Sequence, residues 1–251
     1  MDSFFYFHII NSYEVFDGQN IQIVIDLFTY PNANVLDSMT LERKRAGIRL
    51  KMEEYPSGKR FVIPLEILSS TSTTNNTSET CENEGEARSL VLDDKSCETP
   101  KVMTGTKYYN FNNDGQLILI PQLLTQPGCE HPSINQNYRG KPYKFFYASG
   151  EFFLGKYQNS LVKFCMDNFE TKILWKDEPF YIANQPIFVP NPHAKLGDED
   201  DGIIISLITD ERVGQKSFLL FLDAKDFTEI SRVYFNSFIP RCLQAIFIPQ
   251  T

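Results

Sequence analysis

Histidines are the side chains of this chain best suited to proton transfer or metal binding, and the sequence contains three of them. His8 lies in an apolar run between Phe7 and Ile9. A single imidazole in such a run is either a hydrogen-bonded core residue or a metal ligand. His131 and His193 adjoin prolines in polar stretches, and this pattern predicts two surface residues without a catalytic role. His8 is therefore the candidate for chemistry.

The stretch SFIPRCLQAIFIPQT at 237–251 places the primary amide of Gln244 among apolar side chains. The apolar residues predict a buried strand, and a buried amide without partners costs about 1–3 kcal/mol. Gln244 must therefore either be hydrogen-bonded or occupy a position with a special role. Glu130, taken alone, is typical of a solvated acid or of a residue that caps a turn.

Other potential metal ligands form no recognisable motif. The cysteines contain no CxxC pair, so they predict reduced thiols in a cytoplasmic protein rather than a zinc site or a disulfide framework. They are Cys81, Cys97, Cys129, Cys165 and Cys242. The run DEDDG at 198–202 resembles a calcium loop but lacks the spacing of an EF-hand, and we expect an exposed turn. The net charge of −8 argues against nucleic-acid binding.

Short apolar runs rich in β-branched and aromatic residues must form the framework around these residues, and they predict an all-β fold. The expected strands cover 21–30, 60–67, 116–121, 143–149, 160–166, 171–176, 186–190, 202–209, 217–224, 229–235 and 245–249. We expect hairpins that turn at Asp167-Asn168 and at 224–226, and their spacing favours propeller blades over a sandwich. The irregular apolar spacing of 37–54 leaves a helix and irregular structure equally open.

Residues 69–113 interrupt this pattern, because they are rich in Ser, Thr, Asn and Glu. Such a composition cannot bury enough apolar surface to offset the loss of chain entropy. It predicts a long disordered insertion on the surface of a single domain that spans 1–251.

Five stretches, taken in order, resemble the animal branch of the carotenoid cleavage oxygenase family. They are FHIINSYE (7–14), CEHPSINQNYRGKPYKFFYASG (129–150), QPIFVPNPHAKLGDEDDGIIIS (185–206), FLLFLDAKDFTEISR (218–232) and IPRCLQAIFIP (239–249). The resemblance implies a seven-bladed β-propeller in which four histidines bind Fe(II), with outer glutamates that accept hydrogen bonds from three of them. It also implies oxidative cleavage of a carotenoid or retinoid polyene by O₂, and contact with membrane surfaces.

Position by position, the resemblance assigns His8 to a metal-ligand histidine and Glu130 to an outer glutamate. Gln185 stands where the family has a second outer glutamate, and Gln244 stands where it has the last ligand histidine. The two remaining ligand histidines lie in blades that precede FHIIN in the family. The resemblance therefore implies that this chain carries the C-terminal blades, with iron bound weakly or absent.

The length of the chain supports the same expectation. Without the insertion about 200 residues remain, which is material for four to five blades of about 40–45 residues each. An open arc of blades predicts self-association through its exposed sheet edges. The chain is then a fragment, a truncated gene model or a degenerate paralogue, with impaired cleavage on its own. The alternative is a non-catalytic homologue that binds an apolar polyene or a partner protein, in the cytoplasm or at a membrane surface.

Overall fold

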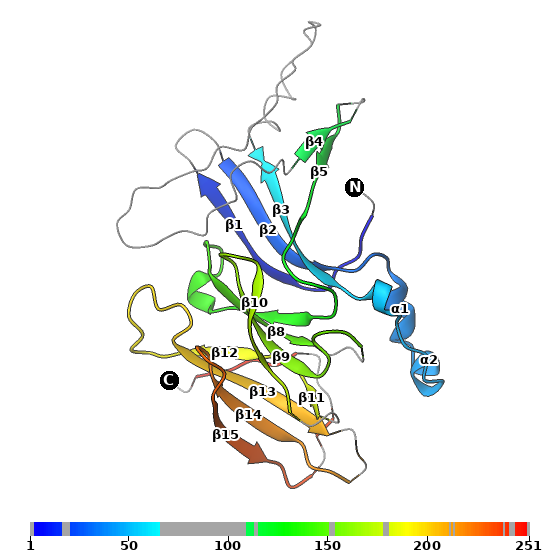
Figure 1. The fold of residues 1–251 in the computed structure, drawn as a ribbon, viewed down its shortest axis with the longest axis vertical. Helices are drawn as coiled ribbons and strands as arrows, with labels where there is room; N and C mark the ends of the chain where they lie inside the picture. Colours follow the sequence, from blue (N-terminus) through cyan, green and yellow to red (C-terminus); the bar gives the residue numbers. More distant parts are fainter. Residues whose placement is uncertain are drawn as a thin grey trace, which may run out of the picture.

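The chain forms consecutive antiparallel sheets with very little helix, in a computed structural model (Figure 1). The structure describes residues 3–16, 21–65, 109–112, 115–150, 154–177, 181–210, 212, 214–237, 239–240 and 244–249. In Figure 1 the sheets follow one another from top to bottom in the order of the sequence. This confirms the predicted all-β fold built from propeller-type units.

The first sheet contains the N-terminal strands in the order β1-β2-β3-β6. Its strands are β1 (Ile9–Phe16), β2 (Ile21–Thr29), β3 (Ser57–Pro64) and β6 (Gln122–Leu123). A separate ribbon pairs β4 (Tyr109–Phe111) with β5 (Leu117–Leu119). Because β4 falls inside the predicted insertion at 69–113, the C-terminal boundary of that prediction is wrong. Residues 66–108 and 113–114 lie outside the described residues.

The second sheet has the order β10-β9-β8-β7. Its strands are β7 (Glu130–Ser133), β8 (Phe145–Gly150), β9 (Ser160–Cys165) and β10 (Glu170–Trp175). Every residue of β9 is buried, since this sheet has a neighbour on each face. The turn between β9 and β10 contains Asp167-Asn168, which confirms the first predicted hairpin.

The third sheet has the order β11-β13-β14-β15, and β12 also pairs with β13. Its strands are β11 (Tyr181–Ala183), β12 (Ile187–Pro190), β13 (Gly202–Asp210), β14 (Phe218–Asp223) and β15 (Glu229–Tyr234). The β14–β15 pairing confirms the second predicted hairpin. The described residues thus form three sheets of blade size, fewer than the four to five blades that length alone predicted.

Short helices connect β2 to β3, where the sequence left helical and irregular structure open. They are α1 (Asn34–Ser38), α2 (Leu41–Arg45) and the 3-10 turn η1 (Met52–Glu54); a second such turn, η2 (Gln136–Tyr138), follows β7. No single helix covers 37–54, because Gly47 adopts a left-handed conformation just after α2 and ends it.

Two apolar clusters join the sheets, and they follow the alternation of side chains along β8 and β9. Phe146 and Val162 pack toward Phe28 and Val62 of the first sheet, whereas their chain neighbours pack toward the third sheet. The second cluster includes Tyr147, Leu161, Phe188, Ile204, Leu220 and Leu222. The middle sheet is thereby buried on both faces.

A buried polar network also joins the first two sheets. Arg60 of β3 donates two hydrogen bonds of 2.8 Å to the carboxylate of Asp26 on β2. Tyr143, just before β8, donates its hydroxyl to the same carboxylate at 2.8 Å. All three side chains are at most 2 % exposed, and burial raises the pKa of Tyr143 well above its usual range. The hydrogen bond from Tyr143 to Asp26 therefore links the second sheet to the ion pair of the first sheet.

The DEDDG turn is buried in part, which corrects the prediction of an exposed turn. Glu199 is 3 % exposed, and its carboxylate accepts hydrogen bonds from the backbone N–H groups of Lys144 and Phe145 at the start of β8. Asp200 forms a 2.7 Å ion pair with the buried ammonium of Lys163 on β9. The sequence pattern alone predicts a solvated turn. The partners of Glu199 and Asp200 lie on the second sheet, far away in the sequence, so no local pattern reports them.

The predicted strand at 245–249 is not present. Residues 244–249 pair with no strand among the described residues, and Ile246, Phe247 and Ile248 are 50–75 % exposed. An apolar run forms a buried strand only where a neighbouring sheet edge accepts its backbone hydrogen bonds. The described part of the chain supplies no such edge here, so the segment remains extended and exposed.

Candidate metal centre at the starts of the inner strands

The candidate residues gather because each sheet places an edge strand at a corresponding position. His8 immediately precedes β1, Glu130 begins β7, and Gln185 lies two residues before β12. Strands β1 and β7 are in contact. Side chains from three sheets far apart in the sequence therefore meet at the starts of these edge strands.

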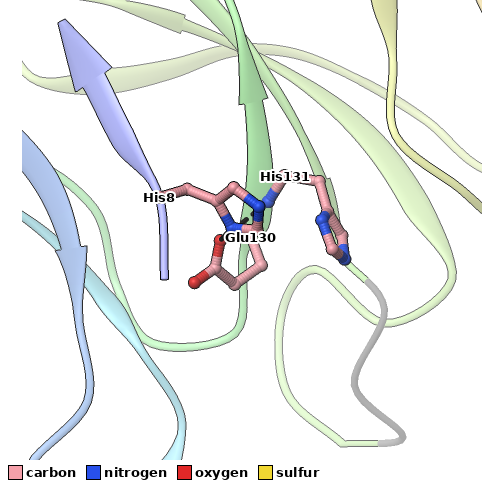
Figure 2. Close-up of side chains that lie close together, drawn as sticks. All are labelled: His8, Glu130 and His131. Atoms are coloured by element: carbon pink, nitrogen blue, oxygen red, sulfur yellow. Dashed lines mark hydrogen bonds and ion pairs between the residues drawn. The ribbon is translucent and has the colours of Figure 1, made fainter. Parts of the chain in front are cut away.

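His8 and Glu130 form a direct pair. Figure 2 shows His8 Nδ1 next to Glu130 Oε2, and the two atoms are 2.8 Å apart. Because an ionised carboxylate only accepts, Nδ1 is the donor in this pair, and a neutral ring in this tautomer has its lone pair at Nε2. The side chain of Glu130 is 1 % exposed and that of His8 is 21 % exposed. A carboxylate that orients an imidazole in this way is a common arrangement around bound metals.

Glu130 is fixed by several contacts. Its Oε2 atom also accepts a hydrogen bond from the backbone N–H of His131 at 2.9 Å, and its carbonyl oxygen accepts one from Ser149 Oγ at 3.4 Å. Its Oε1 atom is buried and has no hydrogen-bond partner among the described residues. The carboxylate is therefore held through Oε2, while Oε1 keeps an open acceptor position.

His131 is a member of the same cluster, which corrects the prediction of a surface residue. It is 5 % exposed, and the centre of its ring lies 5.0 Å from that of His8 (Figure 2). His8, Glu130 and His131 each offer a ligand atom within 4.8 Å of the others. The sequence signal that could have placed His131 here is its position next to Glu130. In a regular strand, however, two neighbouring side chains point to opposite faces of the sheet. His193 is exposed, as predicted.

The two glutamines that stand at family positions also reach the centre. Gln244 Nε2 lies 3.4 Å from His8 Nε2, and Gln185 Oε1 accepts a 2.9 Å hydrogen bond from the backbone N–H of Ala245. Gln244 is exposed, so the burial cost expected for its amide does not arise. The structure thus brings together all four predicted site residues: His8, Glu130, Gln185 and Gln244.

The residues present do not fit a four-imidazole iron site. The whole sequence contains three histidines, and His193 lies in the β12–β13 connection as an exposed residue. Cys129 and Cys165 are buried free thiols, and burial raises the pKa of Cys129 well above its usual range, so its thiolate is not available as a ligand. Cys81, Cys97 and Cys242 lie outside the described residues.

An apolar cavity of about 750 Å³ adjoins the start of β1. Ile25, Leu27, Phe61 and Ile63 line its floor, on the face of the first sheet that points away from the second sheet. Tyr6 and Leu117 are among the other lining residues. The volume is within the range of about 300–1,000 Å³ that is typical of small-molecule sites.

The family model for the retinal pigment epithelial membrane protein, RPE65, matches residues 1–249. The chain belongs to the RPE65/carotenoid oxygenase family. It is 29 % identical to a β,β-carotene 15,15'-dioxygenase of Mus musculus, covering 97 % of this chain and 38 % of that protein. It is 31 % identical to a mitochondrial carotenoid-cleaving dioxygenase of Mustela putorius furo, covering 90 % of this chain and 38 % of that protein. The predicted family is thereby confirmed.

Members of this family with solved structures share the fold. A chimera of ACO and RPE65 and the cobalt-substituted ACO of Synechocystis each match with a TM-score of 0.62 and 20 % identity, covering 95 % of this chain and 38 % of theirs. The chain spans about 40 % of the length of the curated relatives it matches. None of the helices in the described ranges is long and apolar enough to cross a membrane.

Proposed function

We propose that this chain is a polyene-binding member of the carotenoid oxygenase family whose capacity for oxidative cleavage is impaired. Carotene dioxygenases of mouse and chicken are among its relatives. The observation that carries the proposal is the 2.8 Å pair of His8 and Glu130, accompanied by amides at Gln185 and Gln244. One oriented imidazole, that of His8, is retained. The family resemblance assigns a ligand histidine to position 244 and an outer glutamate to position 185, and both are neutral amides here.

Bound Fe(II) would supply dioxygen activation in this family. Imidazole donors suit Fe(II), and a carboxylate behind each ring raises its basicity. In this chain Glu130 performs that task for His8 by holding the proton on Nδ1. Gln185 carries no charge and accepts from the backbone of Ala245 instead. We therefore propose that iron is bound weakly or not at all.

The apolar cavity supports a carotenoid or retinoid as the ligand. Its aliphatic and aromatic floor offers no charged group, and each Å² of apolar surface removed from water contributes about 25 cal/mol. Phe4 stacks on Phe61 at a ring distance of 5.3 Å and forms part of the same wall. A long, flat hydrocarbon matches such a surface, whereas a polar substrate does not.

Two assays on the purified protein test this function. In the first, the protein is incubated with Fe(II), O₂ and β-carotene in detergent; we expect no retinal, and clear retinal formation would refute impaired cleavage. In the second, retinol or β-carotene is titrated and its absorption shift is followed. Ile63→Ser should weaken binding about tenfold or more, while Ile230→Ser on the exposed strand β15 should leave it unchanged. Equal binding by both variants would refute the assigned cavity.

A second function, association with another protein chain, is favoured by a different surface. Ile230, Val233 and Tyr234 of β15 are each at least 50 % exposed, and the outer edge of β15 pairs with no strand among the described residues. Such edges pair readily with other strands. Sedimentation velocity measures this self-association, which we expect to weaken in Val233→Lys. A wild-type protein that stays monomeric over the whole concentration range would refute it.

We also propose that the protein is cytoplasmic and that it contacts membrane surfaces, as the family resemblance implies. Vesicle flotation measures this contact.

A further inference from the structure

We propose that His131 supplies a second imidazole beside His8, and that the chain binds one divalent first-row cation through His8, His131 and the amide oxygen of Gln244. This ligand set differs from the four imidazoles that the family resemblance implies. It uses a histidine that the sequence comparison with the family does not mark as a ligand. Two imidazoles and one carbonyl oxygen suit Zn²⁺ and its analogue Co²⁺, rather than the Fe²⁺ of a four-imidazole site.

The distance between the two rings matches shared coordination. With metal–nitrogen bonds of about 2.0–2.1 Å, each ring centre lies about 3.2 Å from the ion, so two ligand rings at right to tetrahedral angles lie about 4.5–5.2 Å apart. The observed separation of His8 and His131 is 5.0 Å, with an angle of 62° between the planes. Figure 2 shows the His131 ring beside the imidazole of His8, on the side away from the Oε1 oxygen of Glu130.

Gln244 occupies a third position around the same point. Its Nε2 atom is 3.4 Å from His8 Nε2, and two donors on a tetrahedral ion with bonds of about 2.1 Å are also separated by about 3.4 Å. Rotation of the amide by 180° places Oε1 there in place of Nε2. Gln244 is exposed and the side chain of His8 is 21 % exposed, so an ion can reach the site from solvent.

A β-bulge brings His131 to this side of the sheet. Glu130 pairs with Ser149 and Ser133 pairs with Tyr147, so β7 carries one extra residue over this interval. His131 has a φ of 55°, in the left-handed region that costs a non-glycine residue about 1–2 kcal/mol. Bulges commonly re-aim side chains at functional sites. Here the bulge lets two consecutive residues, Glu130 and His131, both face His8.

The charge of Glu130 favours a cation. Its carboxylate is 1 % exposed, and its only ion-pair partner within the described ranges is His8, whose ring is neutral when Nε2 presents a lone pair. Its buried Oε1 atom has no hydrogen-bond partner among the described residues, so a positive charge nearby is favourable. An ion bound at Nε2 of His8 would supply that charge through the imidazole, in the usual carboxylate–histidine–metal arrangement.

Titration of the purified full chain with Co²⁺ tests the proposal, because Co²⁺ in a low-coordinate protein site absorbs visible light much more strongly than aqueous Co²⁺ does. We expect saturation at one ion per chain, and displacement by Zn²⁺. A strong near-ultraviolet thiolate band would show binding to cysteine instead and would refute the proposal. Visible absorption no stronger than that of the same Co²⁺ in buffer alone would refute it too. The readout is independent of polyene binding and of cleavage, so failure of the proposed function leaves it interpretable.

Variants of the three histidines provide the matched comparison. His131→Asn keeps a residue that tolerates the left-handed backbone, and circular dichroism with the thermal midpoint verifies its fold. Glu130→Gln should weaken Co²⁺ binding about 10–100-fold, and His131→Asn and His8→Asn should weaken it at least as much. His193→Asn, at the exposed third histidine, should bind as the wild type does. Gln244→His should bind more tightly.

Two results would contradict this assignment. If His131→Asn is folded and binds Co²⁺ with the wild-type affinity and spectrum, His131 is not a ligand. If His193→Asn loses as much affinity as His131→Asn, the binding is adventitious.

Discussion

Gln185 accepts a hydrogen bond from the backbone N–H of Ala245 at 2.9 Å, across sixty positions of the sequence. Ala245 follows Gln244, whose amide lies against His8. The extended segment 244–249 forms no strand pairing among the described residues, and this bond is a direct contact that holds its backbone next to Gln244 in place. Gln185 stands where the family resemblance implies a charged glutamate, and here its amide instead holds the backbone of segment 244–249.

Removing that anchor should loosen the segment without unfolding the domain. We expect Gln185→Ala to raise hydrogen–deuterium exchange at 244–249, while the free energy of unfolding falls by no more than about 1.5 kcal/mol, the net value of one hydrogen bond. Gln185→Glu keeps the acceptor oxygen and should preserve protection. Unchanged exchange in Gln185→Ala would show that other contacts hold the segment.

Breaking the buried Arg60–Asp26 pair should cost far more. Asp26→Asn leaves the guanidinium of Arg60 buried without its countercharge, and we expect a loss of about 3–5 kcal/mol in urea unfolding. Tyr143→Phe removes one hydrogen bond to the same carboxylate and should cost about 1–3 kcal/mol. The two effects should be non-additive, because both residues share one network. Additive losses would contradict a common network.

Glu199 should make stability depend on pH. Burial raises its pKa from the usual value to about 7, against the opposing effect of the backbone N–H donors of Phe145 and Lys144. A group with a raised pKa in the folded state contributes stability that is complete below the unfolded pKa near 4.5 and is lost as pH rises through 7. Wild type relative to Glu199→Gln should therefore lose stability between pH 4.5 and 7, by at most about 3 kcal/mol.

Chemical unfolding of both proteins at intervals across this range gives the difference curve. Other titrating groups cancel in that difference, since the two chains share them. A flat difference curve would mean that the backbone donors to Glu199 cancel the effect of its burial, so that its pKa is not raised.

Gly150 should be intolerant of any side chain. A Cβ atom there would overlap the backbone carbonyl oxygen of Tyr157, and Gly150 follows Ser149, the pairing partner of Glu130. We expect Gly150→Ala to destabilise the protein by about 3 kcal/mol or more in thermal or urea unfolding. Gly140→Asn is the control, because that position has open space and asparagine tolerates its positive φ. A wild-type midpoint for Gly150→Ala would refute the close contact.

Local patterns predict most strands, because the apolar and β-branched residues that favour a strand lie within the few positions of the strand itself. The hairpins at 167–168 and 224–226 followed from turn residues between apolar runs. The strand expected at 245–249 failed because its formation depends on a partner edge that no local pattern reports. The end of α2 likewise depends on the left-handed conformation of Gly47.

The site was predictable only in part, for a related reason. His8, Glu130, Gln185 and Gln244 were found through their positions in family-like stretches, and the structure brings all four together. The surface prediction for His131 is wrong because it rests on the adjacent proline and the polar neighbours, whereas a β-bulge, which no such local pattern reports, brings its ring next to that of His8. The partners of Glu199 on β8 are more than fifty residues away, so no spacing along the sequence could have revealed its burial.

The middle sheet rests on a neighbour at each face, whereas the first and third sheets each bury one face in these contacts. Heating should therefore detach the outer sheets before β8 and β9 melt. Since His8 and Glu130 sit on opposite sides of the seam between the first two sheets, their pairing would vanish while much of the circular dichroism signal persists. On heating, the protein would therefore lose its capacity to bind a ligand at this pair at a lower temperature than it loses its circular dichroism signal.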